Sequence, residues 1–232
     1  MIKNRFYTSF PALAIRYRKL AKYSWEEEIG FVKNYLRRQG RGGLFLDVGA
    51  HLGTWASWIG SRTQPVVAFE PNPSLAGLLR RSRISNTEVL EFALGAETGS
   101  ADLKIPFRDG LPRPGNGTIT DFRLGPSDRL LTSSVNVRKL DDFALRQVAA
   151  IKIDCEGGEE QVLRGSAGVI ARDRPLLVVE IHHERRQDFE NVTELLSAFG
   201  YSANWLNRGQ IVSTLEKERL PIVDNVLFLP ES

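Results

Sequence analysis

Short apolar runs alternate with amphipathic segments along most of this 232-residue chain. Each run is five or six residues long and ends at turn-forming or polar residues, which is typical of strands buried on both faces. We expect buried strands at residues 44–49, 66–70, 89–94, 150–154 and 176–181. Apolar positions at helical spacing predict helices at 11–22, 25–39, 54–61, 73–84, 158–171 and 187–199.

This alternation predicts an α/β fold. Strands separated by helices of about a dozen residues indicate a doubly wound, mostly parallel sheet with helices on both faces. The last two strands, 201–206 and 225–230, have no strong helix between them, so we expect an antiparallel edge hairpin at the C-terminus. With this hairpin the sheet has seven strands. Residues 99–139 break the alternation with prolines and glycine turns and predict an irregular insertion with short antiparallel pieces.

The composition indicates an ordinary globular protein. Hydrophobic residues make up 42% of the chain and charged residues 25%. The single cysteine, Cys155, excludes an internal disulfide and, by itself, a thiolate zinc site. We find no run of 18 apolar residues and no apolar stretch of a secretory signal near the N-terminus. We therefore expect a cytoplasmic protein without a transmembrane helix.

Positive charge is concentrated near the N-terminus. Residues 1–42 contain ten Lys or Arg against three Glu, although the net charge of the whole chain is only +3. We divide the chain into this helical basic segment and a domain spanning 43–232. The helix at 25–39 has a capping box in Ser24 and Glu27. The basic segment can contact anionic lipid, nucleic acid or a phosphorylated substrate, and a solvated helix face is the simpler alternative.

Acidic side chains recur where the predicted strands end. Ligands of open α/β sheets bind beyond the carboxyl ends of the strands, and carboxylates there are not needed for folding. The repetition is the strongest functional signal in the chain. The residues at these ends are Asp47, Glu70, Asp154, Glu156, Glu180 and His182.

The loop after the first strand predicts a nucleoside-containing ligand. Gly49 permits a tight turn, and Gly53 lets the following helix approach the strand. The start of that helix offers free N–H groups to an anionic part of a ligand. Glu70, 17 residues after Gly53, can accept both hydrogen bonds of a ribose diol, so we expect an adenosine ligand. The alternative is a tight turn beside an exposed glutamate.

The same loop disfavours a nicotinamide dinucleotide. Its pattern requires three glycines, and this chain has Ala50 and His51 where the middle glycine would fall. Asp47 would repel a pyrophosphate. An acid at that position suits a ligand that carries an ammonium or sulfonium cation, such as S-adenosylmethionine.

Four blocks in this order resemble the FkbM family of S-adenosylmethionine-dependent methyltransferases. They are Phe45–Thr54, Ala68–Asn72, Val137–Asp142 and Ile151–Glu159, within a resemblance that covers about residues 40–230. The last block is the most specific. The family commonly has Asn at the position of His51 and often an aromatic residue at that of Gly158. The resemblance implies a class I, Rossmann-like methyltransferase sheet and O-methylation of a hydroxyl on a sugar, glycolipid, polysaccharide or secondary metabolite.

The resemblance also implies roles for individual residues. Gly49, Ala50 and Gly53 would contact the methionine part of the cofactor, and Asp47 would orient its amino group or the loop. Glu70 would bind the ribose, and residues at the ends of the second and third strands would border the adenine. The implied cofactor-binding residues are Asp47, Gly49, Ala50, His51, Gly53, Thr54, Glu70, Pro71, Asn72, Ala93 and Leu94.

An alcohol that accepts a methyl group must lose its proton, so a nearby base is expected. In the class I sheet Asp154, Glu156 and His182 should face the transferred methyl. We predict Asp154 or His182 as the base and Glu156 as a residue that orients the acceptor. The alternative for Asp154 and Glu156 is that they cap the helix beginning near Gly157.

Two further hypotheses concern the surroundings of the methyl group. Two acids and a histidine could hold Mg²⁺ or another divalent ion that lowers the pKa of a hydroxyl, although no metal ligands are assigned. Residues 106–127 could form a lid over the acceptor, with Phe107, Arg108, Asn116 and Arg123 as contacts, or could be a surface loop.

Three alternatives remain beside the O-methyltransferase. One is a binding module that keeps the adenosine site and has lost catalysis, and another is an NAD-dependent oxidoreductase. The third is a nucleic-acid methyltransferase, suggested by the basic segment. The chain lacks an Asn/Asp-Pro-Pro-Tyr/Phe base-methylating motif, so we expect no stable nucleic-acid partner. The expected partner is a small-molecule or glycan acceptor, reached if needed through peripheral contact of the basic segment with a membrane.

Overall fold

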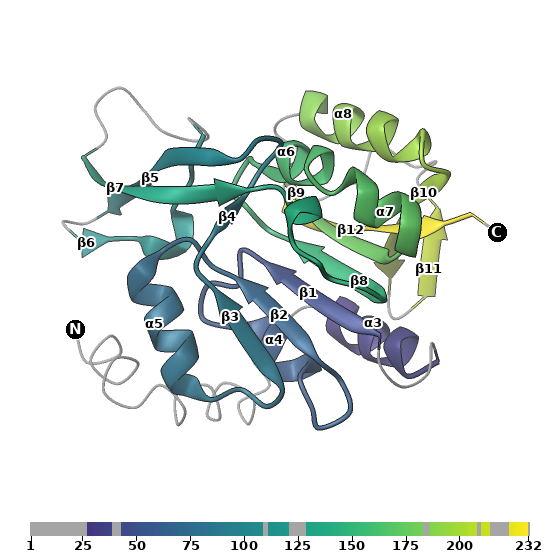
Figure 1. Ribbon diagram of the computed structural model, residues 1–232. Coiled ribbons are helices and arrows are strands. Elements are labelled where there is room, and N and C mark those ends of the chain that lie inside the picture. Colours follow the sequence, from purple (N-terminus) through teal and green to yellow (C-terminus); the bar gives the residue numbers. More distant parts are fainter. Residues whose placement is uncertain are drawn as a thin grey trace.

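The protein is built on one large mixed sheet (Figure 1). The computed structural model describes residues 27–38, 43–108, 111–120, 129–182, 186–207, 210–213 and 223–231. Within these residues eight strands are ordered β11-β10-β12-β9-β8-β1-β2-β3 across the sheet. Their bounds are β1 Leu44–Val48, β2 Val66–Phe69, β3 Thr87–Leu90, β8 Val148–Ile153, β9 Leu176–His182, β10 Tyr201–Asn207, β11 Gln210–Ser213 and β12 Val223–Pro230.

The centre of the sheet is parallel, as the alternating pattern predicts. Strands β3, β2, β1, β8 and β9 pair in parallel, and β12 pairs antiparallel with both β9 and β10. This is the doubly wound, mostly parallel sheet that the sequence predicts, with β11 added at the edge.

The C-terminal end of the sheet corrects two details of the prediction. The two predicted C-terminal strands do pair antiparallel, as β10 and β12. They do not form the edge, because the described sheet has eight strands, not seven: β12 lies between β9 and β10, and β11 pairs with the outer side of β10. The physical reason is that Val226, Leu227 and Phe228 are consecutive and fully buried. A strand that is apolar on both faces requires neighbours on both sides and cover above and below.

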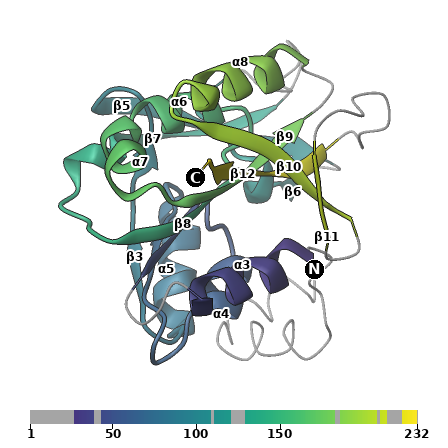
Figure 2. The ribbon, with the colours of Figure 1, turned by 90° about the vertical axis from the view of Figure 1, so that its right-hand side faces the viewer.

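Helices cover both faces of the sheet (Figure 2). Helices α3, α4 and α5 pack on one face through apolar residues such as Val32, Ala56 and Leu79. Helices α6, α7 and α8 pack on the other through residues such as Leu163 and Leu196. Their bounds are α3 Glu27–Arg38, α4 Thr54–Ile59, α5 Pro73–Ser82, α6 Glu159–Arg164, α7 Ala167–Asp173 and α8 Arg186–Ser197.

The N-terminal part of the chain is only partly described. The predicted helix at 25–39 corresponds to α3, which buries Ile29, Val32 and Leu36 against the sheet. The predicted helix at 11–22, the capping residue Ser24 and most of the basic residues of 1–42 lie outside the described residues. Among the helices that are described, none is long and apolar enough to cross a membrane.

The insertion at 99–139 is more regular than expected. The prediction of short pieces is wrong for β5 (Gly99–Arg108) and β7 (Leu130–Arg138), which pair antiparallel along most of their length. With β4 (Ala93–Leu94) and β6 (Leu111–Pro112) they form a second sheet in the order β4-β7-β5-β6. One face is apolar, so β5 and β7 can pack as a half-buried pair. The prolines and glycine turns of this region led us to predict short pieces instead of two long strands.

Two predicted elements are divided in the structure. The strand expected at 89–94 is interrupted at Glu91 and Phe92, so β3 ends in the large sheet and β4 begins in the second sheet. The helix expected at 158–171 is interrupted at Gly165. A Cβ at Gly165 would lie 2.0 Å from the carbonyl oxygen of Gly95. The interruption therefore lets the second sheet approach α6 and α7.

We expect Gly165→Ala to lower the free energy of unfolding by about 1–3 kcal/mol, because the new methyl group overlaps the backbone of Gly95. Urea unfolding followed by circular dichroism measures the change. Gly30→Ala is the matched control, since Gly30 lies in α3 with nothing within 4 Å of its Cβ position. There alanine should stabilise the helix by roughly 0.5–1 kcal/mol. Equal effects of the two substitutions would contradict the close approach at Gly165.

Candidate active site

A pocket of about 200 Å³ lies at the carboxyl ends of β1, β2, β8 and β9. Its position agrees with the rule for open α/β sheets. Residues from the second sheet and from the turn after β6 close its remaining side. The lining residues are Val48, Gly49, His51, Glu70, Pro71, Asn72, Phe92, Ala93, Leu94, Leu103, Pro114, Gly117, Ile119, Asp154, Cys155, Glu156, Gly158 and Glu180.

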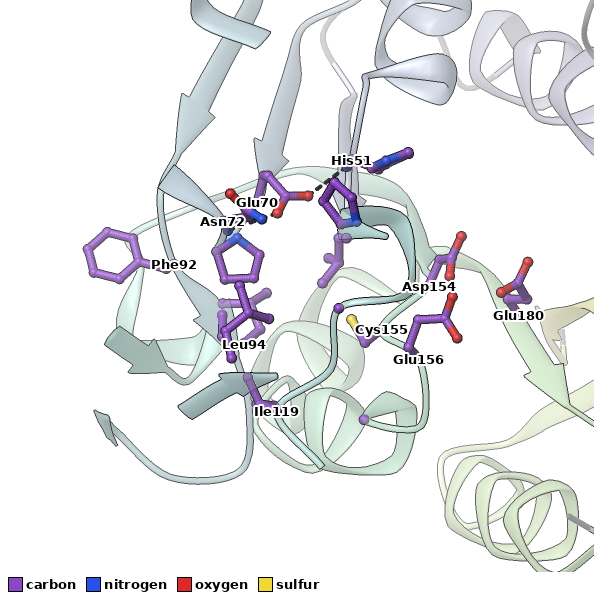
Figure 3. A pocket seen from close by; sticks show the side chains of 18 residues that line it. His51, Glu70, Asn72, Phe92, Leu94, Ile119, Asp154, Cys155, Glu156 and Glu180 are labelled. Carbon is purple, nitrogen blue, oxygen red and sulfur yellow. Dashed lines mark hydrogen bonds between the residues drawn. The ribbon is translucent and has the colours of Figure 1, made fainter. Parts of the chain in front are cut away.

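Glu70 occupies one end of the pocket, directly after β2 (Figure 3). Its Oε2 accepts a hydrogen bond from the backbone N–H of His51 at 2.7 Å, and its Oε1 accepts one from that of Asn72 at 2.9 Å. The side chain is only 5% exposed. Burial raises the pKa of Glu70 to about 7, against the opposing effect of the two hydrogen bonds.

The glycine loop after β1 is shaped by a close contact with the loop after β8. Gly49 has a φ of 78°, and a Cβ there would lie 1.8 Å from the carbonyl oxygen of Asp154. The N–H of Asp154 donates to the carbonyl of Val48 at 3.0 Å. Only glycine fits this turn. The loop on the cofactor side of the pocket and the loop on the predicted catalytic side are therefore in direct backbone contact at Gly49 and Asp154.

Several predicted cofactor residues support the loop from behind the pocket. Asp47 is buried, and its Oδ2 accepts a hydrogen bond from the N–H of Ala56 at 2.9 Å in the first turn of α4. Asp47 therefore holds the loop, one of its two predicted roles. Ala50, Gly53 and Thr54 also do not line the pocket. Ala50 packs in the core, Gly53 precedes α4 with a φ of 72°, and Thr54 begins that helix.

The other predicted cofactor residues line the pocket itself. Gly49, His51, Glu70, Pro71, Asn72, Ala93 and Leu94 are among its walls. His51 has a left-handed backbone with a φ of 49°. The side chain of Asn72 caps α5 by accepting from the N–H groups of Ser74 and Leu75.

Three carboxyl groups face one another at the opposite end of the pocket (Figure 3). They belong to Asp154 and Glu156 after β8 and to Glu180 in β9. Burial and the charge of Asp154 raise the pKa of Glu180 to about 9, while Lys152 acts in the opposite direction. The structure therefore brings the two predicted acids together with a third acid that the sequence placed at a strand end without a role.

A further glutamate holds the loop that carries Asp154 and Glu156. Oε1 of Glu159 accepts from the N–H groups of Cys155 and Gly157, at 3.0 and 3.1 Å. These bonds support left-handed backbone at Glu156 and Gly157, with φ of 50° and 95°. The sequence suggested Asp154 and Glu156 as caps of the next helix, and Glu159 is the carboxylate that holds these amides.

His182 is the last of the predicted catalytic residues, and Cys155 is a pocket residue to which the sequence assigned no role. His182 is the last residue of β9, and its backbone lies opposite Val223, but its side chain lies outside the described residues. Burial raises the pKa of the Cys155 thiol well above its usual range, so the thiol stays protonated at neutral pH. Among the described residues, no group of three His, Cys, Asp or Glu could hold a metal ion.

The second sheet provides lining residues that sequence reasoning missed. Leu103, Pro114, Gly117 and Ile119 reach the pocket from the region left as an irregular insertion. Phe92 precedes the predicted Ala93, and this adjacency was the one available signal for it. Of the four suggested lid contacts, Phe107 and Asn116 do not line the pocket. The side chain of Arg108 and all of Arg123 lie outside the described residues.

Thr118 anchors this region to the catalytic side. It is 2% exposed, and its Oγ1 donates to the carbonyl of Glu156 at 2.9 Å. Its backbone forms a two-way bridge with Lys104 of β5. The N–H of Thr120 in turn donates to Oγ1 of Thr118. The segment after β6 is thus fixed to both the second sheet and the loop that carries Glu156.

Comparison with known proteins decides the family. The model of the methyltransferase FkbM domain matches residues 47–203, which is more than half of the chain. The chain belongs to the FkbM methyltransferase family. A search of curated proteins found no match.

Solved structures agree with this fold. The structure of the methyltransferase FkbM from Methylobacillus flagellatus KT is 20% identical, with a TM-score of 0.50. The match covers 84% of this chain but only 46% of that longer chain. A TehB-like SAM-dependent methyltransferase from Corynebacterium glutamicum is 13% identical, with a TM-score of 0.49 and coverage of 94% and 96% of the two chains. The likeness to the first shows that the FkbM domain here has a class I methyltransferase fold.

We expect Thr118→Val to loosen the segment over the pocket, because the buried carbonyl of Glu156 loses its donor at a cost of about 1–3 kcal/mol. Amide hydrogen exchange at Lys104, whose N–H donates to the backbone carbonyl of Thr118, should become roughly tenfold faster or more. Thr132→Val is the control, since Thr132 is exposed on β7 of the same sheet. Unchanged exchange at Lys104 in Thr118→Val would show that the hydroxyl bond does not hold the segment.

Proposed function

We propose that this FkbM-family protein transfers a methyl group from S-adenosylmethionine to a hydroxyl group of a sugar, glycolipid, polysaccharide or secondary metabolite. One observation carries the proposal. A single pocket has a buried carboxylate suited to a ribose diol at one end and three carboxyl groups suited to a hydroxyl at the other. The family supplies the transfer of a methyl group, and the carboxyl groups support the choice of oxygen as the acceptor atom.

The described residues fit S-adenosylmethionine. Each oxygen of Glu70 accepts one backbone N–H and keeps a second lone pair for a ribose hydroxyl. Gly49 presents bare backbone in the wall of the same pocket. Phe92, Leu94 and Ile119 give the same pocket apolar walls against which an adenine ring can pack. When bound, the cofactor supplies a methyl group already activated on a sulfonium.

The residues of the chain must align the acceptor and remove its proton. We assign the removal of the acceptor proton to Asp154, whose Oδ atom would accept it as the acceptor oxygen bonds to the methyl carbon. The cofactor would supply that carbon on a sulfonium, which would leave as a neutral thioether. Glu156 can orient the acceptor by accepting from a second hydroxyl, which favours a polyhydroxy acceptor.

The surroundings of the pocket support the remaining parts of the proposal. Pro114, Gly117 and Ile119 come from the segment suggested as an acceptor lid, and Thr118 fixes that segment beside Glu156. His182 remains the alternative base. Three proposals rest on the sequence alone: that the basic segment 1–42 contacts an anionic membrane, that the protein is cytoplasmic, and that a divalent ion takes part in the reaction.

The pKa of Glu70 predicts how cofactor binding depends on pH. Protonation removes a lone pair that a ribose hydroxyl would use, so affinity should fall as the pH falls through about 7. Calorimetry should show S-adenosylhomocysteine binding about tenfold more tightly at pH 8 than at pH 6. Glu70→Gln should bind more weakly at both values and without this difference. NADH should not bind. If the wild-type protein bound S-adenosylhomocysteine equally well at both pH values, Glu70 would be excluded as the ribose ligand.

A transfer assay tests the proposed function directly. Methyl-labelled S-adenosylmethionine is incubated with the protein and with polysaccharide, lipid and RNA extracts, and labelled sugars are identified as O-methyl ethers after hydrolysis. Asp154→Asn should reduce labelling by about 10²-fold or more while S-adenosylhomocysteine affinity stays within about threefold. Label found in RNA instead would overturn the carbohydrate acceptor. Full activity of Asp154→Asn would remove its role as the base.

A further inference from the structure

Lys152 is buried in the middle of the sheet, directly below the three carboxyl groups. It lies in β8 and is 2% exposed. Its Nζ lies 5.8 Å from the centre of the Trp55 ring and donates to the carbonyl of Ile153 at 3.3 Å. A lysine so deep in a core is costly unless acidic partners surround it. Lys152 does not line the pocket, so it has no direct role in the mechanism above.

The acidic partners come from the strands on both sides and from the loop above. Asp47 of β1 and Val178 of β9 are the sheet neighbours of Lys152. Asp47 and Lys152 therefore lie side by side on the face that packs against α4. Above them, Oδ2 of Asp154 lies 3.8 Å from Nζ of Lys152. The ammonium thus lies between a carboxylate that holds the cofactor loop and the predicted base.

Glu180 joins this group from the neighbouring strand. Two residues after Val178, it lies on the same face of β9, opposite Asn225 of β12. Its carboxyl group faces that of Asp154 in the pocket (Figure 3). Two facing carboxyl groups can form a hydrogen bond with each other only if one of them carries a proton. Lys152 lies beside Asp154 and stabilises the charge of that carboxylate, whereas burial and the charge of Asp154 raise the pKa of Glu180, so we place the proton on Glu180.

The charges that surround the pair explain why one proton is retained. The described acids that act on Glu180 are Asp154 and Glu156, and Lys152 is the cation that opposes them. Asp47, Glu70 and Glu159 lie behind or beside them, and all three already accept backbone N–H groups. Asp154, Glu156 and Glu180 are only partly buried, but they lie together beside one ammonium, so retaining one proton lowers the repulsion among the three carboxyl groups.

We propose that Glu180 and Lys152 are positioning residues for methyl transfer. Glu180 donates its proton in a hydrogen bond to Asp154, and Lys152 balances the negative charge of Asp154 from below. This inference rests on the proposed function, since Asp154 is the group that receives the proton of the acceptor. Glu180 keeps its own proton throughout the step, so the acceptor proton goes to the free side of the Asp154 carboxylate. Lys152 lies outside the pocket, and the role proposed for Glu180 is exerted through Asp154.

The protonation of Glu180 is tested without any acceptor. Side-chain carboxyl groups labelled with ¹³C are titrated by NMR, and the Glu180 signal is assigned by its loss in Glu180→Gln. The wild-type signal should titrate near pH 9. Asp154→Asn should lower this midpoint by about one pH unit or more, and Lys152→Met should raise it by about one unit. Lys152→Arg keeps the charge and should leave the midpoint within about half a unit of wild type.

The outcomes separate an electrostatic role from a merely structural one. A wild-type Glu180 midpoint near that of an ordinary glutamate would overturn the proposal. So would a folded Lys152→Met whose Glu180 midpoint is unchanged. If Lys152→Met does not fold, the wild-type and Asp154→Asn titrations still decide whether Glu180 holds the proton. S-adenosylhomocysteine affinity should stay within about threefold in Lys152→Arg, because Lys152 lies outside the pocket.

The positioning role is tested in the transfer assay. Glu180→Gln keeps a donor toward Asp154 and should retain label transfer within about threefold, whereas Glu180→Ala should lose about tenfold or more. Equal transfer rates for Glu180→Gln and Glu180→Ala would overturn the positioning role, whether both variants keep the wild-type rate or both lose it. If the wild-type protein labels no extract, the proposed function fails. The NMR titration still decides whether Glu180 holds the proton and whether Lys152 affects it.

Discussion

The contact between the backbone of Gly49 and the carbonyl of Asp154 determines how the two halves of the site meet. A side chain at Gly49 would overlap that carbonyl at 1.8 Å, so the loops after β1 and β8 can approach only because no Cβ is present. Glu70 then fixes the far side of the same loop through the N–H of His51. The cofactor end and the acceptor end of the pocket are therefore held at a distance set by backbone geometry.

Buried acids around this junction are stabilised in different ways. Asp47 and Glu159 hold loops by accepting backbone N–H groups, and Glu70 does so while its pKa is raised to about 7. Glu180 is stabilised by keeping its proton. The way each acid is stabilised depends on its position, because free backbone N–H donors are available at loop turns but are already used inside a strand such as β9. A parallel sheet can thus present several acids on one edge without accumulating their charges.

The second sheet converts an open edge into an enclosed pocket. Its residues Leu94 and Leu103 line the pocket together with the carboxyl ends of the large sheet, and Thr118 bonds to the loop of Glu156. Gly165 permits its close approach to α6 and α7. Enclosure matters for methyl transfer, because an aligned acceptor and the exclusion of water are the main contributions a protein can make to this reaction.

Much of the site could be predicted from order along the chain. Apolar strands that end in Asp47, Glu70 and Asp154 meet at one edge in any doubly wound sheet, so their convergence follows from sequence and topology. The same reasoning missed Phe92, Leu103 and Ile119, since apolar residues in an insertion carry no signal of which cavity they face. It also missed β11 beyond the predicted pair of β10 and β12, because a strand of four exposed residues lacks the buried apolar pattern of the others.

The sequence by itself determined the family, the parallel order of the central strands and the identity of the acids at their ends. These features follow from local patterns, namely short apolar runs, glycine turns and the residues that succeed them. The tertiary structure alone decided that Glu159 holds the β8 loop, that Lys152 lies below Asp154 and that Glu180 keeps a proton. Hydrogen bonds, desolvation and charge coupling act between segments distant in sequence, and they acquire their strength only once folding has excluded water.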